Sequence, residues 1–227
     1  MSIEVRGRVL SVNLARVQPN PDKRGEVLTG IEKVPTSEPV LVRAPGSKRD
    51  GRGGGLVGDT VCDRRNHGGD TQAVYAYARE DLDHWQSVLE RTLAGGVFGE
   101  NLTTTGVDVN GAVIGEHWRI GDELELAVTV PRIPCGTFRG WIAERGWLRT
   151  FARAAMPGTY LSVVTPGHVR AGDPVTIVHR PAHGVTVAQV FRAITLEPAL
   201  LPSILVADEL EDETREMART GRTFALD

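Results

Sequence analysis

One segment near the middle of the chain restricts the fold more than any other, because it must run as a β-strand into a proline-rich turn. Residues 123–130 carry leucine or valine at alternate positions, which predicts a strand buried on one face. Pro131 and Pro134 follow, and proline cannot donate a hydrogen bond to a neighbouring strand. We therefore expect the strand to end in a stiff loop that presents Cys135.

Cys135 is the candidate reactive group of the chain. Residues 136–145 predict a short helix that begins beside it, and Arg132 and Arg139 are close in sequence. A helix N-terminus and nearby guanidinium groups lower the pKa of a thiol and favour the thiolate. The commoner role of an isolated cysteine is that of a small buried apolar residue, so the residues by themselves leave both roles open.

The composition is typical of a globular protein. The chain has 227 residues, of which 41% are hydrophobic and 24% charged, and this length can bury a full core. A formal net charge of −3 disfavours a general nucleic-acid binder. No apolar run reaches the length of a membrane span, and the first residues lack the apolar core of a signal peptide. We expect a cytoplasmic protein without a membrane or nucleic-acid partner.

The two cysteines, Cys62 and Cys135, do not define a cross-linked or zinc-bound fold. They are far apart in sequence and have neither a disulfide framework nor the spacing of a zinc site. A bridge between them is not expected in a reducing cytosol.

Short strand-like segments separated by turns dominate the chain up to about residue 180, and their spacing favours a β-barrel. Residues 79–93 predict a helix that Gly95 and Gly96 stop, and residues 147–156 predict a second one. Residues 166–168 predict a turn. The fold class is therefore mainly β with some α.

The pattern becomes helical near residue 184, with Thr186 as a helix N-cap. We expect a β-barrel domain over residues 1–182 and a short helical tail over residues 183–227.

Two polar turns carry further candidate side chains. His67 precedes Gly68 and Gly69, and such glycines allow close approach to a ligand, with amide N–H groups free for an anion and the imidazole free to act as an acid. Glu100 and Asn101 share a turn, where they can hold one another and read the edge of a heterocycle. A surface histidine and ordinary turn residues are the alternative roles.

Two basic segments have less specific patterns. Residues 46–55 are rich in glycine, lysine and arginine, but they lack the strand, helix and lysine placement of a phosphate loop. We expect a flexible surface loop there. Lys33 lies in a strand-like segment. Its ammonium group either points into a site or is solvated on an edge strand.

Six short motifs stand in the order seen in MOSC domains. They are residues 30–35, 57–59, 67–70 with 73–75, 99–102, 131–135 and 171–173. The resemblance spans about residues 5 to 180 and is closest to the YiiM-like branch; six ordered motifs make chance agreement improbable, although each alone is weak. It implies an antiparallel MOSC-type β-barrel that binds the molybdenum cofactor, a molybdopterin, with Cys135 as the molybdenum ligand.

The same resemblance implies a reductase of N-hydroxylated bases and related N-oxygenated compounds, which detoxifies base analogues. His67, Glu100 and Asn101 would then orient the substrate at the metal, with His67 protonating the departing water. The candidate contacts for the cofactor phosphate are Lys33, Gly68, Gly69, Arg132, Arg139 and Arg170. Because no flavin, haem or iron–sulfur motif occurs, an external electron-donor protein is expected. The oligomeric state, including a homodimer, is left open.

The sequence departs from the YiiM-like pattern in two places. The C-terminal region is short for the three-helix appendage of that branch, and Glu116 replaces the aspartate expected after Ile-Gly. Two other functions also stay open. In one, Cys135 serves a non-catalytic carrier of the molybdenum cofactor or of sulfur; in the other, Cys135 and His67 form a hydrolytic pair.

Overall fold

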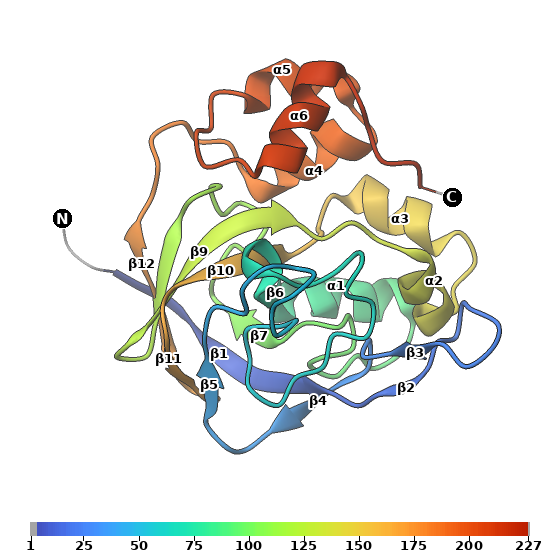
Figure 1. Ribbon diagram of the computed structural model, residues 1–227, viewed down its shortest axis with the longest axis vertical. Coiled ribbons are helices and arrows are strands. Elements are labelled where there is room, and N and C mark those ends of the chain that lie inside the picture. The colour runs from blue at the N-terminus through green and yellow to red at the C-terminus, as the bar shows by residue number, and fades with distance from the viewer. Residues whose placement is uncertain (1–3, 227) are drawn as a thin grey trace.

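The structure is a computed structural model that describes residues 4–226, and its centre is a closed β-barrel (Figure 1). The strand order is β12-β8-β9-β10-β6-β7-β1, and β12 pairs with β1 to close it, while β4 adds to the outer edge of β1. Neighbouring strands are antiparallel except for β6 and β7. The prediction of a mainly β, mostly antiparallel barrel with C-terminal helices is confirmed.

The strands are β1 (Glu4–Ala15), β2 (Gln18–Pro19), β3 (Leu28–Thr29), β4 (Lys33–Thr36), β5 (Val40–Val42), β6 (Val74–Ala78), β7 (Leu102–Thr105), β8 (His117–Ile120), β9 (Leu124–Pro131), β10 (Thr159–Thr165), β11 (Gly167–Val169) and β12 (Pro174–His179). The α-helices are α1 (Arg79–Leu89), α2 (Gly136–Ile142), α3 (Trp147–Ala154), α4 (Val187–Thr195), α5 (Leu201–Ile204) and α6 (Asp212–Thr220). The 3₁₀ helices are η1 (Asp70–Gln72) and η2 (Pro198–Leu200).

Strand β9 is the segment that the alternation predicted. Its leucine and valine side chains at alternate positions are buried in the barrel. Pro131 still faces Thr159 of β10 in the register, and α2 begins at Gly136 with Cys135 as its N-cap residue. The predicted order of strand, proline loop and helix is confirmed, and it fixes Cys135 at the end of a barrel strand.

A second, aromatic core lies outside the barrel and supports this loop. It joins β6, α1, α2 and α3 through tyrosine, tryptophan and phenylalanine side chains. Trp85 and Trp147 have ring centroids 4.8 Å apart, and those of Phe98 and Phe138 are 5.1 Å apart, in edge-to-face geometry. Because such interiors are as dense as organic crystals, the base of α2 and the start of the Cys135 loop are rigidly held.

The C-terminal region is helical, as expected from the sequence. It contains α4, α5 and α6, which lie together over the barrel (Figure 1). The predicted N-cap is confirmed, since Thr186 Oγ1 accepts a hydrogen bond from the Gln189 N–H at 3.2 Å. Buried side chains of α4 and α6 belong to the same core as those of the barrel. The helices therefore share a hydrophobic core with the barrel.

Glu116, the departure from the family pattern, has a buried carboxylate that is paired with the half-exposed Arg180. Its carboxylate accepts hydrogen bonds from Trp118 Nε1 at 2.8 Å and from Arg180 Nε at 2.5 Å. A buried carboxylate is tolerated when it is paired and hydrogen-bonded. Each of the two carboxylate oxygens of Glu116 thus accepts a hydrogen bond.

Two predictions of element boundaries are wrong. Helix α1 ends at Leu89, where Glu90 takes the left-handed conformation, and so it stops before Gly95 and Gly96. The predicted turn at residues 166–168 is largely strand β11, which pairs with β5. The missing side chain of Gly167 lets this strand lie against the Leu124 backbone.

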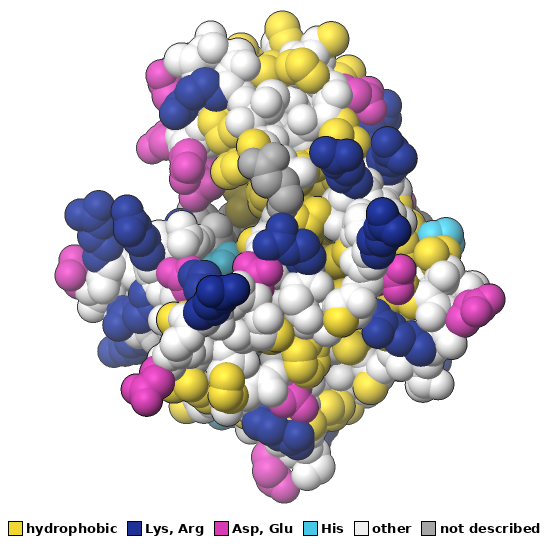
Figure 2. Space-filling view, turned by 90° about the vertical axis from the view of Figure 1, so that its right-hand side faces the viewer, with side chains coloured by type: hydrophobic (Ala, Val, Ile, Leu, Met, Phe, Trp, Pro, Cys, Tyr) yellow, Lys and Arg dark blue, Asp and Glu magenta, His cyan; other side chains and the backbone are white. Residues whose placement is uncertain are grey.

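Charged side chains of both signs are interspersed over the face of the molecule shown in Figure 2. Within residues 4–226, no helix is both long and apolar enough to cross a membrane.

Candidate functional site

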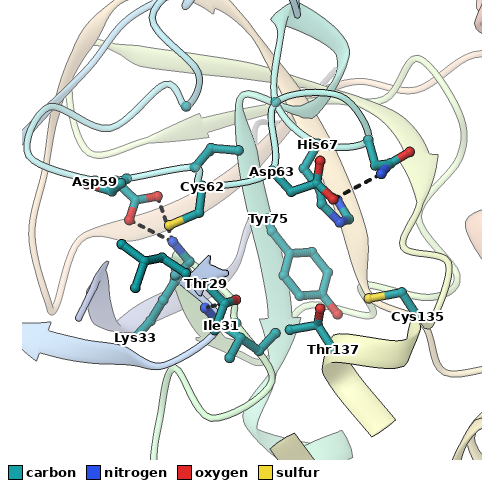
Figure 3. Close-up of a pocket in the computed structure, with 18 of the residues that line it drawn as sticks. Thr29, Ile31, Lys33, Asp59, Cys62, Asp63, His67, Tyr75, Cys135 and Thr137 are labelled. Atoms are coloured by element: carbon teal, nitrogen blue, oxygen red, sulfur yellow. Dashed lines mark hydrogen bonds and ion pairs between the residues drawn. The ribbon is translucent and has the colours of Figure 1, made fainter. Parts of the chain in front are cut away.

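A cavity of about 750 Å³ lies beside the end of β9 and is lined by Cys135. Figure 3 shows Cys135 and His67 on one side of Tyr75, and Cys62 with Lys33 and Asp59 on the other. The cavity is bounded by segments far apart in sequence: residues 17–33, residues 59–68, β6, β10 and the proline loop. The barrel therefore brings both cysteines into one site.

The surroundings of Cys135 favour its thiolate. Burial acts to raise the pKa of this thiol, but the hydrogen bond with the His67 side chain, the positive charge of Arg132 and the Phe138 backbone N–H outweigh it and lower the pKa to about 6. Near neutral pH the sulfur is thus mostly ionised, as a nucleophile or metal ligand must be. The geometry favours a reactive role over that of a passive core residue.

This ionisation gives a testable pH dependence. Because only the thiolate reacts, the rate of Cys135 alkylation by iodoacetamide is expected to rise with pH through a midpoint of about 6. His67→Asn should move the midpoint upward, because it removes the imidazole that stabilises the anion. The measurement is the rate of adduct formation at Cys135, followed by peptide mass spectrometry.

Cys62 is the internal control for that titration. Burial raises the pKa of its thiol, although the nearby Lys33 charge acts in the opposite direction. Cys62 should therefore react only at distinctly higher pH than Cys135. Equal pH profiles for the two thiols would contradict the assignment.

Arg132 is a buried cation with an unused hydrogen-bond donor. Its side chain is 4% exposed, and its guanidinium carbon lies 3.8 Å from the ring centroid of Phe138 and 5.6 Å from that of Tyr75. Within residues 4–226, no acceptor bonds its Nη1. Buried donors are normally satisfied. An anionic ligand in this cavity would supply the missing acceptor, so the site fits an anion.

Lys33 is already paired. Its Nζ lies 2.7 and 2.6 Å from the two carboxylate oxygens of Asp59, and its side chain is only 9% exposed. The alternative of a solvated edge lysine is therefore wrong. Its charge is directed into the site but is compensated there, which leaves it a weaker anion contact than Arg132.

The amide of Asn101 is also committed to protein partners. Its Nδ2 donates to Asp59 Oδ2 at 2.8 Å, and its Oδ1 accepts from the Tyr75 N–H at 3.1 Å. Asn101 lines the cavity, but these bonds leave it little capacity to read a heterocycle edge. We interpret Asn101 as a positioning residue for Asp59. Asp59 belongs to the motif at residues 57–59, and the sequence alone predicts no role for it.

Glu100 lies behind the cavity wall and not on it. Its buried carboxylate accepts hydrogen bonds from the N–H groups of Gly96 at 2.6 Å and Phe98 at 3.0 Å, and from Thr103 Oγ1 at 2.9 Å. Burial raises the pKa of this carboxyl group. The side chain holds the loop before β7, and it does not contact the space in which a substrate would bind.

The expectation of free amides after His67 is wrong. The Gly68 N–H donates to Gln72 Oε1 at 3.2 Å, and the Gly69 N–H donates to the Gly53 carbonyl at 2.9 Å. His67 and Gly68 line the cavity, whereas Gly69 does not. The imidazole is therefore the chemically available group of this turn.

The two glycines are needed for close packing. Both have positive φ, and a Cβ at Gly68 would lie 2.6 Å from the Gly53 carbonyl oxygen, while one at Gly69 would lie 3.0 Å from the Lys48 nitrogen. They let the His67 turn lie against residues 46–55, in which Gly53 to Gly55 are buried. The prediction of a flexible surface loop is wrong for this buried part.

Two of the predicted phosphate contacts lie away from the cavity. Arg139 is on α2 and binds the Asp22 carboxylate, with Nη2 2.7 Å from Oδ1. Arg170 is exposed near Asp173, with Nε 3.5 Å from its Oδ1. Neither lines the cavity. Of the arginines proposed from the sequence, only Arg132 lies in the site.

Several known proteins are similar to this chain in sequence or in fold. The protein YflK of Bacillus subtilis is 30% identical over 182 residues, which are 80% of this chain and 78% of that protein. A protein named "Reductase" from Gibberella moniliformis is 28% identical over 191 residues, 83% of this chain but only 32% of that longer protein. The crystal structure of YiiM from Geobacillus stearothermophilus has the same fold, with a TM-score of 0.74 at 22% identity, over 95% of this chain and 98% of that one.

The MOSC domain model matches residues 63–176, which is half of the chain and includes both His67 and Cys135. The resemblance inferred from the six ordered motifs is thereby confirmed. The chain belongs to the MOSC domain family.

Proposed function

We propose that this protein is a molybdenum-cofactor-dependent reductase of N-hydroxylated bases and related N-oxygenated compounds. The observation that carries the proposal is the presence, in one cavity, of a cysteine with a lowered pKa and a buried arginine with an unpartnered donor. The similarity to a protein named "Reductase" supports the reaction class.

The residues of the cavity fit a molybdopterin. Cys135 would provide a soft, anionic sulfur ligand, which suits a metal that already carries sulfur ligands from its cofactor. Arg132 would donate to an anionic group of the cofactor. Within residues 4–226, no group of three or more His, Cys, Asp or Glu side chains could hold a metal. A single protein thiolate is consistent with a metal that arrives with its own ligands.

The bound cofactor would supply two-electron redox chemistry. The reaction balances as RNHOH + 2e⁻ + 2H⁺ → RNH₂ + H₂O, in which the N–O bond breaks. His67, beside Cys135 in the cavity, would deliver a proton to the departing oxygen. The electrons come from an external donor protein.

The second candidate function is that of a cysteine hydrolase. A histidine that lowers the pKa of a thiol in the same cavity is also the arrangement of a cysteine hydrolase. A hydrolase, however, gives no role to the unpartnered Arg132 donor. The carrier function shares the cofactor site and differs only in lacking turnover.

The test compares one protein made in two hosts. Protein purified without oxygen from a host that makes the molybdenum cofactor should convert an N-hydroxylated purine to the amine with dithionite and a viologen mediator, as measured by chromatography. Protein from a host unable to make the cofactor is the control and should be inactive. Bound metal without turnover would replace the reductase by a carrier, and ester hydrolysis by cofactor-free protein would replace it by a hydrolase.

A further inference from the structure

One wall of the cavity is a hairpin that stands apart from the barrel. Strands β2 and β3 form a separate two-stranded sheet, beside α2 in Figure 1. We call residues 17–31 the hairpin arm. Nine of its residues line the cavity: Val17, Asn20, Lys23, Glu26, Val27, Leu28, Thr29, Gly30 and Ile31. The arm therefore contributes a large part of the surface that a bound molecule would meet.

The arm is attached to the helix that begins at Cys135. Asn20 Nδ2 donates to Thr137 Oγ1 at 2.9 Å, and Asp22 binds Arg139. A Cβ at Gly136 would collide with the Asp22 carboxylate, so the absence of a side chain there allows the close approach. These contacts fix the position of the arm relative to the thiol.

The arm presents aliphatic side chains to the cavity mouth. Val17, Val27 and Leu28 line the cavity and yet are 43%, 39% and 51% exposed. A ligand that covers these side chains removes apolar surface from water, which makes its binding more favourable. Single exposed aliphatic residues need no explanation, but three on one cavity wall point to a contact surface.

The side of the cavity across from Thr29 and Ile31 is polar. It contains Asp63, Asn66 and His67 from the turn before η1, and Asp63 Oδ2 also lies 4.0 Å from Lys23 Nζ of the arm. In Figure 3, Asp63 and His67 face Thr29 and Ile31 across the space beside Tyr75. The arm itself also brings polar residues to the cavity, so the lining combines a group of exposed aliphatic side chains with polar groups. Such a lining suits a flat molecule that has an apolar face and a polar edge.

We infer that the hairpin arm selects the substrate, with Val27 and Leu28 contacting the planar organic part of an N-hydroxylated heterocycle. The inference rests on the proposed function for the class of substrate. It adds that the protein prefers flat heteroaromatic N-hydroxy compounds to small aliphatic ones, and that these two exposed residues set the preference.

The test is a double variant, Val27→Ser with Leu28→Ser, and the matched control is Val164→Ser. Val164 is 46% exposed on β10 and does not line the cavity. Binding of adenine, a heterocycle without an N–O bond, is measured by calorimetry on the cofactor-loaded protein. KM and kcat are measured for an N-hydroxylated purine and for N-methylhydroxylamine.

The double variant should weaken adenine binding and raise KM for the N-hydroxylated purine by about three- to tenfold, as expected for the loss of two apolar contacts. Its kcat, and its KM for N-methylhydroxylamine, should stay unchanged, and Val164→Ser should match the wild type. Unchanged adenine binding in the double variant, no adenine binding by the wild type, or an equal loss for both substrates would overturn the inference. If the wild type reduces neither compound, the proposed reductase fails, while adenine binding still decides the role of the arm.

Discussion

Replacing Cys135 by serine is expected to remove the molybdenum from the protein. A serine hydroxyl is neither ionised near neutral pH nor a soft ligand, so the interaction that the lowered thiol pKa favours is lost. Changes in groups that only orient a metal ligand cost about 10- to 100-fold in affinity, and removal of the ligand itself should cost at least as much. The measurement is the molybdenum and pterin content per protein after purification without oxygen from a cofactor-rich host.

Cys62→Ser is the matched control for this experiment. Cys62 lines the same cavity, but it lies across Tyr75 from Cys135, beside Lys33 (Figure 3). It should retain wild-type metal. The metal-free forms of both variants should keep the thermal midpoint of metal-free wild type at a pH below 6, because both substitutions are nearly isosteric and no thiolate is lost at that pH. Equal metal in Cys135→Ser and the wild type would refute the ligand assignment, and absence of metal and pterin from all folded forms would refute cofactor binding altogether.

Local pattern was sufficient to predict the part of the site that one segment builds. The alternation over residues 123–130 and the prolines at 131 and 134 determine β9 and the end of its pairing, and Cys135 follows from them. These features depend on side-chain periodicity and on proline stereochemistry, both of which are readable in one sequence. The helix expected after Cys135 begins at Gly136, although it ends at Ile142.

The contacts between distant segments were not readable in this way. Whether Lys33 is free depends on Asp59, which is 26 positions away, and whether the Gly69 amide is free depends on Gly53. Each partner is brought in by barrel closure or by loop packing, which no local pattern encodes. The sequence marks Asp59 only as part of the motif at residues 57–59. Membership of that motif does not reveal that Lys33 is its ion-pair partner.

Barrel closure also explains why charge is distributed so unequally in the cavity. Lys33 and Asp59 neutralise one another at one side, whereas Arg132, at the start of the proline loop, faces aromatic rings instead of a carboxylate. A fold selected only for stability would pair or remove such a cation, because its burial costs free energy. Arg132, which has no acceptor for its Nη1 and whose charge favours the Cys135 thiolate, is therefore the residue at which stability and function are expected to oppose each other.

Replacing Arg132 by methionine is expected to lower molybdenum content by about tenfold or more, as for loss of a charge-assisted contact to an anion. The pKa of Cys135 should rise above its present value of about 6, because the guanidinium charge helps to lower it. Below the Cys135 pKa of about 6, where the thiol is protonated and Arg132 has no anion to stabilise, stability should not fall. The cation–π contacts contribute about 2 kcal/mol at most, whereas desolvation of an unpaired ion costs several kcal/mol, and methionine can fill the same space between Phe138 and Tyr75.

Arg170→Met is the matched control, since it removes one exposed positive charge that does not line the cavity. It should change neither the metal content nor the pH profile of Cys135 alkylation. The free energy of unfolding comes from denaturant titration of metal-free protein, so that ligand binding does not contribute to it. A variant Arg132→Met that is less stable by more than about 2 kcal/mol and yet retains its metal would show that the arginine holds the fold. The opposite result, a stable protein without metal, would show that its charge is kept for a ligand.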